Sequence, residues 1–151
     1  MRFQLEMRAT DGSDTPPVTI AYRPRRMVRL VVLMLSWEMA VDAGPAPKFP
    51  LWAVYGVSDF DSAGRPVGER ATDYETALAR ILSGHGRTDR EGIPVHKLST
   101  NLGWHVTAAE CAAAIRCFNA GVAAGQDATV FGKKLIPFLR AAAAGDGFEV
   151  H

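Results

Sequence analysis

The sequence predicts an α+β fold, in which a small antiparallel sheet of about three to five strands packs against about three or four helices. Residues 2–8 alternate apolar and polar side chains, as a strand with one buried face does. The stretches 24–43, 72–83 and 107–123 instead repeat apolar residues with a helical period. Of the 151 residues, 48% are hydrophobic and 22% charged, so the chain can bury a core without disulfides. We therefore expect a single compact domain over residues 1–151.

The N-terminal part is expected to form a hairpin followed by an apolar helix. Turn-forming residues at 11–17 separate the first strand from a second apolar run at 18–22. Pro24 suits the first turn of a helix that runs to about residue 43, and Gly44 suits its C-terminal end. Apolar side chains on most sides are typical of a buried helix, or of one that also faces another subunit. A strand over 28–35 is the alternative, because β-branched residues are frequent there.

The middle of the chain is expected to contain a linker, a strand and a helix. Residues 45–50 are rich in proline and predict a stiff linker, and the apolar residues 51–57 predict a buried strand. Thr72 and Glu75 have the spacing of a capping box, which places a helix start at Thr72. Polar and turn-forming residues predict mobile loops near 10–17, 58–71 and 84–92.

Two further helices are expected in the C-terminal third, after a short strand at 93–98. Thr107 forms a second capping box with Glu110. The helix behind it carries one apolar stripe, formed by Cys111, Ile115, Phe118 and Val122. Pro137 lacks an amide hydrogen, so it must kink the last helical region or begin a new piece. Residues 148–151 are interpreted as an edge strand.

Charge and cysteine content limit the function classes. The formal net charge is +1, which indicates neither a polybasic nucleic-acid binder nor an acidic mimic. The arginines between residues 23 and 29 form a short cluster with no aromatic residues among them, so they are interpreted as helix-start charges. A phosphate or nucleic-acid contact is the alternative. Two cysteines are few for a secreted disulfide framework, and no apolar run reaches the roughly 20 residues of a membrane span. We expect a cytoplasmic protein, and the Ala-, Gly- and Arg-rich composition suggests an accessory or phage-encoded one.

The segment 101–107 is the candidate binding site. Its glycine and asparagine provide a turn, and its tryptophan is a large flat side chain with a histidine beside it. A tryptophan near polar groups, ahead of a helix N-terminus, suits recognition of a protein partner, a peptide or a nucleotide base. The alternative is a hydrophobic staple that packs on the first turn of the following helix. The candidate ligand- or partner-binding residues are Asn101, Trp104, His105, His96 and Lys97.

No catalytic residue, metal or cofactor is predicted. Cys111 near a helix N-terminus could act as a thiolate with His105 as base, but its place in an apolar stripe favours a core thiol. The histidines and cysteines lack zinc-type spacing. Asp59 and Asp61 could hold a divalent cation, but the Ser-Ala-Gly that follows is typical of a turn. Residues 83–87 could contact a phosphate, but they follow a helix, where the dipole repels anions.

These observations favour a non-enzymatic binding protein that captures a protein partner and self-associates through the apolar helix at 24–43. The alternative is a small-molecule or nucleotide-binding domain that uses Trp104 and His105. A small hydrolase or transferase is the third hypothesis. Neither a membrane nor a nucleic acid is expected as a partner.

Overall fold

A computed structural model describes residues 2–7 and 18–151. The expected turn at 11–17 and the loop near 10–17 lie outside the described residues. Within them the predicted α+β class is confirmed, with five α-helices and a four-stranded antiparallel sheet. Contacts divide the chain into two compact units, a main unit of Met1–Pro45 with His85–His151 and an inserted unit of Ala46–Gly84. The expectation of a single domain over 1–151 stays a prediction.

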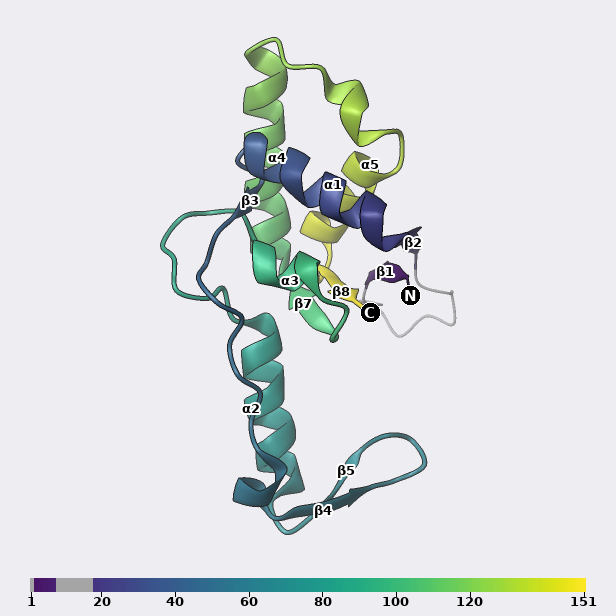
Figure 1. Cartoon of the computed structure of the whole chain (residues 1–151), viewed down its shortest axis with the longest axis vertical. Helices are drawn as coiled ribbons and strands as arrows, with labels where there is room; N and C mark the ends of the chain where they lie inside the picture. Colours follow the sequence, from purple (N-terminus) through teal and green to yellow (C-terminus); the bar gives the residue numbers. More distant parts are fainter. Residues whose placement is uncertain (1, 8–17) are drawn as a thin grey trace. The chain divides into compact units, whose positions relative to one another are not determined.

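The main unit is built on a sheet with strand order β2-β1-β8-β7 (Figure 1). Its strands are β1 (Phe3–Met7), β2 (Thr19–Tyr22), β7 (Trp104–Val106) and β8 (Phe148–Val150). Val150 pairs with Leu5 on one side and with Trp104 on the other, so the apolar side chains of three strands share one face. The edge position expected for the last strand is wrong. Phe148 and Val150 are fully buried, and β8 lies between β1 and β7.

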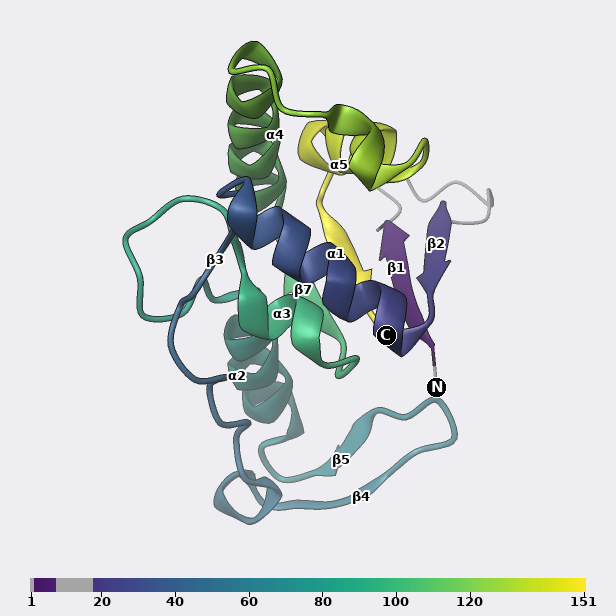
Figure 2. The same cartoon turned by 45° about the horizontal axis from the view of Figure 1, so that its top comes forward.

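Helices cover the apolar face of this sheet. They are α1 (Pro24–Ser36), α3 (Val95–Ser99), α4 (Ala108–Ala123), the 3₁₀ helix η2 (Ala128–Phe131) and α5 (Leu135–Ala144). Figure 2 shows α1 crossing in front of the sheet, and its buried Met27 and Met34 join the same core as Leu5. Pro137 lies in the first turn of α5, so it begins a new helical piece, as predicted. On α4 the expected stripe is buried at Cys111 and Phe118.

Helix α1 ends well before the expected end near residue 43. After Ser36 the chain closes the helix through Glu38, a non-glycine residue with φ 61°. The Glu38 amide donates to the Leu35 carbonyl at 3.0 Å, and the Met39 amide donates to the Met34 carbonyl at 2.8 Å, which is a Schellman motif. The alternative strand over 28–35 is wrong, since these residues are helical.

A short parallel strand pair explains why the helix stops there. Residues β3 (Ala40–Val41) pair in parallel with β6 (Ile93–Pro94), and Met39 beside them is fully buried. The strand expected over 93–98 is therefore only two residues long, and helix α3 follows it directly. No helix in the described part of the chain combines the length and apolar content needed to cross a membrane.

The inserted unit contains the 3₁₀ helix η1 (Trp52–Tyr55), the strands β4 (Val57–Phe60) and β5 (Pro66–Gly68), and α2 (Ala71–Ser83). The buried strand expected over 51–57 is wrong, because residues 52–55 are helical and Gly56, at φ 63°, ends them. The capping box at Thr72 is also wrong. Helix α2 begins at Ala71, so Thr72 already lies in its first turn.

The stretch near 58–71 contains a β-hairpin rather than only a loop. Its turn is organised by Asp61, whose Oδ1 accepts hydrogen bonds from the amides of Ala63 and Arg65, both at 2.9 Å. The interpretation of Asp59 and Asp61 as turn residues is therefore confirmed for Asp61. The Asp59 carboxylate accepts a hydrogen bond from the amide of the next residue at 2.8 Å.

Candidate functional site

Four of the five predicted site residues lie close together in the main unit, but below its surface. The exposed fractions are 0% for Lys97, 1% for Trp104, 6% for His105 and 7% for His96. The fifth, Asn101, is half-buried, and its amide nitrogen lies 3.4 Å from the Arg2 carbonyl oxygen. The segment is thus a buried polar cluster rather than a binding surface.

Trp104 does not offer the exposed face that direct recognition of a partner requires. Its indole Nε1 donates to the Thr100 hydroxyl at 2.8 Å, and its ring meets the His96 ring edge-to-face with centroids 4.9 Å apart. Strand β7 holds the ring against the interior, opposite Val150. The hypothesis of an exposed tryptophan anchor at this position is therefore wrong, and the reason is tertiary packing around β7.

The cluster is organised by the carboxylate of Glu110. The predicted capping box is present, because the Glu110 amide donates to Thr107 Oγ1 at 3.2 Å and Glu110 Oε1 accepts from the Thr107 amide at 2.9 Å. The same Oε1 accepts from Lys97 Nζ at 2.8 Å. Lys97 also donates to the His105 carbonyl at 2.7 Å. A helix cap and a buried ion pair thus share one carboxyl group.

His85 closes the other side of the carboxylate. Its Nδ1 lies 2.7 Å from Glu110 Oε2, and its Nε2 lies 2.7 Å from the Arg90 carbonyl oxygen. Both ring nitrogens of His85 therefore lie within hydrogen-bond distance of an oxygen atom. Glu110 thus contacts side chains from two different segments, His85 of the 85–90 loop and Lys97 of α3. This arrangement connects the loop, α3 and α4 and leaves little of the carboxylate available for a substrate.

Burial controls the titration of the neighbouring groups. It lowers the pKa of Lys97, and the adjacent Glu110 carboxylate opposes that shift. Burial, followed by the negative charge of Glu110, raises the pKa of Cys111 to about 12. The thiol is therefore protonated at neutral pH, which argues against a thiolate nucleophile with His105 as its base. His105 Nε2 lies 2.8 Å from the Asp146 carbonyl oxygen.

His96 is the one member of the cluster whose ring nitrogens, among the described residues, are buried without a hydrogen-bond partner. A neutral ring is favoured there, because burial lowers the pKa of His96 and the charge of Lys97 adds to the effect. Gly86 packs beside it, since a Cβ at that position would lie 3.4 Å from His96 Cε1. Across residues 2–7 and 18–151, no group of three or more His, Cys, Asp or Glu side chains is placed to hold a metal ion.

Sequence reasoning missed two members of this cluster, Glu110 and His85, as site residues. Glu110 was recognised only as a helix cap, and nothing local indicates its pairing with Lys97 or His85. No known protein family, curated protein or solved structure matches this chain. Function must therefore be inferred from the geometry of the molecule.

Proposed function

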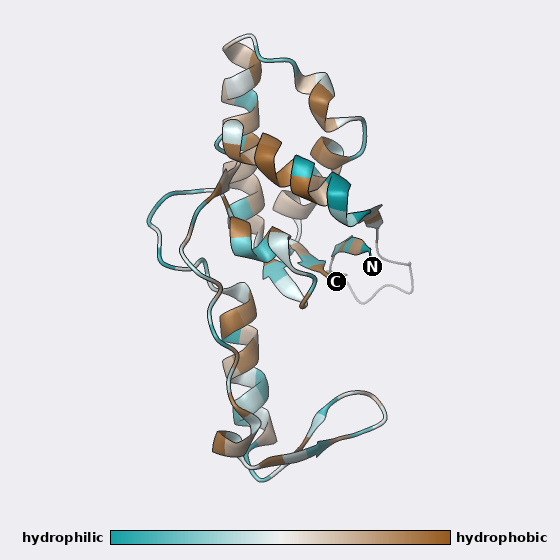
Figure 3. Cartoon of the chain, viewed as in Figure 1, coloured by the Kyte–Doolittle hydropathy of each residue, from teal (hydrophilic) through white to brown (hydrophobic). Residues whose placement is uncertain are grey.

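We propose that this chain is a non-enzymatic binding protein that self-associates through the outer face of α1. One observation carries the proposal. Val28, Val32 and Leu35 follow each other at helical spacing, and their exposed fractions are 64%, 60% and 40%. We call these three residues the α1 stripe. Apolar side chains gathered on one exposed helix face are typical of an interaction surface. In Figure 3, α1 is largely hydrophobic, with hydrophilic bands toward its N-terminal end.

A second copy of the chain fits this face. Beside the α1 stripe lies a hollow of about 140 Å³, whose lining includes Phe3, Leu98, Val28 and Val32. A ridge and a hollow on the same face are what a twofold-symmetric contact needs, because each copy offers both to the other. An antiparallel pairing centred on Val32 would also bring Arg25 of one copy toward Glu38 of the other. Those opposite charges favour this orientation at the rim.

The experiment is sedimentation velocity of the wild-type chain over a roughly hundredfold concentration range, which covers about 2.7 kcal/mol of association free energy. We expect a mass that rises with concentration. Val32→Glu should stay monomeric, because each dimer would bury two carboxylates. Val122→Glu is the matched control, since Val122 is 45% exposed on another helix, α4. A wild-type chain that is monomeric throughout, or Val32→Glu associating like the control, would refute the proposal.

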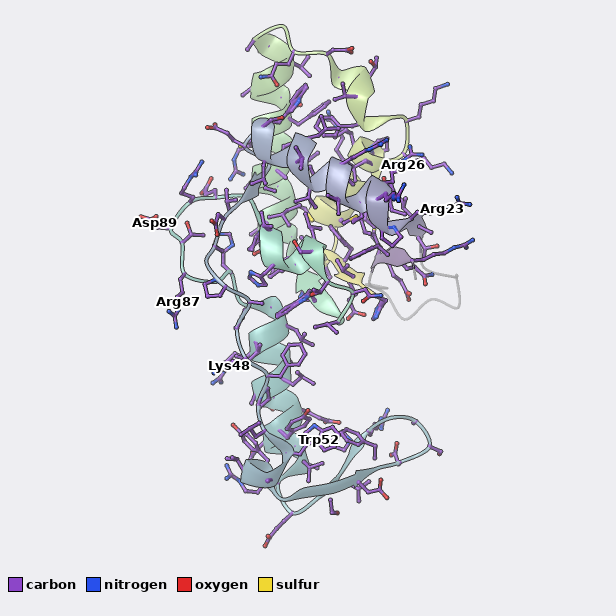
Figure 4. The ribbon with its side chains drawn as sticks, viewed as in Figure 1. Arg23, Arg26, Lys48, Trp52, Arg87 and Asp89 are labelled. Atoms are coloured by element: carbon purple, nitrogen blue, oxygen red, sulfur yellow. The ribbon has the colours of Figure 1, made fainter. Side chains whose placement is uncertain are left out.

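The inserted unit supports a second candidate function, capture of a different protein. Four of its large apolar residues are exposed by 70%, 56%, 63% and 48%, namely Leu51, Trp52, Val54 and Val67. Trp52, which is labelled in Figure 4, is held in place, because its Nε1 donates to the Tyr74 hydroxyl at 3.0 Å. Exposed tryptophans are enriched among residues that dominate binding energy. Trp52 thus has the exposure that Trp104 lacks.

Trp52→Ala separates the two candidates. If the α1 stripe carries self-association, Trp52→Ala should sediment like the wild-type chain. Loss of association in Trp52→Ala but not in Val32→Glu would move the interface to the inserted unit. For partner capture, Trp52→Ala should lose a defined bound protein that Val122→Glu retains.

A nucleotide-binding role would instead be supported by a ligand released from the heat-denatured protein and identified by mass spectrometry. The cytoplasmic location and the phage origin stay predictions.

A further inference from the structure

A basic groove lies beside the N-terminal end of α1. Two adjoining hollows of about 410 Å³ and 480 Å³ share Tyr22, Arg26 and Phe131 in their walls. The cationic side chains that line them are Arg23, Arg25, Arg26, Arg29, Lys133 and Lys134. We call this surface the basic groove. Figure 4 shows Arg23 and Arg26 at the same end of α1.

The groove gathers cationic side chains, although the net charge of the whole chain is only +1. The whole chain has 17 lysines and arginines against 16 acidic residues. Yet six of the cations line these two hollows, and none of the lining residues, all in the described part of the chain, is acidic. Lys133 and Lys134 come from the segment between η2 and α5, far from α1 in sequence. A local field of this kind attracts polyanions even when the net charge is close to zero.

The start of α1 adds to this field. Its N-cap residue Arg23 makes no side-chain cap hydrogen bond, and its first turn contains no acidic residue. The positive end of the helix dipole is therefore not offset by a side chain of its own first turn. Aromatic and apolar surface adjoins the charges, with Arg26 Cζ 5.9 Å from the centroid of the half-buried Tyr22 ring and with the exposed Val130 in the wall.

We infer that the basic groove binds the phosphate backbone of a single-stranded nucleic acid. Two adjoining hollows with six cations suit several phosphates in series better than one. Four of the six are arginines, whose planar guanidinium matches a phosphate with two parallel hydrogen bonds. Aromatic and apolar surface beside a cationic groove is the combination that single-stranded binders use for bases, and an acidic peptide has no bases to place there.

The basic groove favours the alternative interpretation of the arginines at 23–29, a phosphate or nucleic-acid contact, over the expectation that no nucleic acid is a partner. Tyr22, at the end of β2, places an aromatic ring beside these arginines, and Val130 of η2 adds exposed apolar surface. The basic groove is also distinct from the α1 stripe. The groove is lined by Tyr22 and Lys133 together with the arginines of α1, whereas the hollow beside the α1 stripe is lined by Phe3 and Leu98. The two surfaces can therefore be tested separately.

The test is fluorescence anisotropy of a labelled oligothymidine of about 12 nucleotides, titrated with the full chain at several salt concentrations. We expect log K to fall linearly with log salt, with a slope of about 0.7 per phosphate contacted. The double variant Arg26→Glu with Lys133→Glu should weaken binding at least about tenfold at low salt and flatten that slope. The matched control is Lys48→Glu with Arg87→Glu, which makes the same change in net charge at exposed positions outside the groove (Figure 4).

Three further ligands decide the class of polyanion. A duplex of the same length, a polyglutamate peptide and tripolyphosphate should each bind more weakly than the oligothymidine. Polyglutamate binding as tightly would overturn the inference in favour of an acidic protein segment, and tripolyphosphate binding as tightly would favour a small phosphate ligand.

No binding of oligothymidine at the lowest salt, or an equal loss in both double variants, would also overturn the inference. Should the groove double variant fail to fold by circular dichroism, Arg23→Ala and Lys134→Ala serve instead. Each replaces an exposed side chain, and each should reduce the salt slope by roughly one contact.

Discussion

Replacing Glu110 by glutamine tests whether the buried ion pair holds the main unit together. The Glu110 carboxylate is 5% exposed, and its partner Lys97 is 0% exposed. Glutamine keeps the size of the side chain and can still accept from the Thr107 amide, so the capping box is largely preserved. The negative charge is lost, and the Lys97 ammonium is left buried beside a neutral amide. Breaking a buried pair in this way typically costs about 3–5 kcal/mol.

That cost is a large part of the roughly 5–15 kcal/mol by which a domain is stable. The assay is urea unfolding followed by circular dichroism, with the free energy of unfolding extrapolated to water. Thr107→Ala is the control for the cap alone and should cost about 0.5–2 kcal/mol. The double variant Lys97→Met with Glu110→Gln should recover part of the loss, because no isolated charge from this pair remains buried. If Glu110→Gln costs no more than Thr107→Ala, or if the double variant is no better than the sum of the single changes, the reasoning is wrong.

Buried and tightly packed residues elsewhere in the main unit give three other predictions. Because burial lowers the pKa of His96 below its usual 6.5, the unfolded chain binds the extra proton first. The free energy of unfolding should therefore fall as the pH drops below about 6.5, and His96→Leu should flatten that dependence in urea titrations at several pH values. A thiol-reactive chromophore at neutral pH should label the half-buried Cys117 first. The buried Cys111 should react only when the chain unfolds, and early labelling of Cys111 would contradict its burial. Gly147→Ala should cost at least about 3 kcal/mol by thermal unfolding, because its Cβ would overlap the Val106 carbonyl oxygen. Gly125→Ala, at a positive φ with open space around it after α4, should cost only about 1–2 kcal/mol.

The sequence predicted several elements whose signals are local, although the capping box at Thr72 was wrong. Alternation in residues 3–7, the capping box at Thr107 and the proline at 137 each act on their own turn or strand, and each prediction is confirmed. The end of α1 was not predictable in this way. Its apolar pattern continues past Ser36, but pairing with a strand more than fifty residues later makes residues 40–41 extended.

In the candidate site, too, some residues were predicted from sequence, whereas their contacts were not. His96, Lys97 and His105 were selected from sequence, and they do lie together. Their burial depends on the packing of helices from distant parts of the chain, which no short motif indicates. The contacts of Glu110 with Lys97 and His85 depend on the same packing. Gly121 is a further example. Its missing side chain makes room for the Trp37 ring, and no signal within α4 indicates that contact.

The central place of β8 in the sheet also governs the order in which the main unit can fold. Leu5 pairs with Val150, so the sheet joins segments from the two ends of the described chain. Contacts of such long sequence separation are slow to form. Before residues 148–150 leave the ribosome, β1 and β2 can form only a two-stranded hairpin, which is marginal by itself. Until β8 pairs with β1, the core-facing side of the apolar helix α1 remains exposed to solvent. A nascent chain of this protein should therefore depend on chaperones until its last strand is inserted.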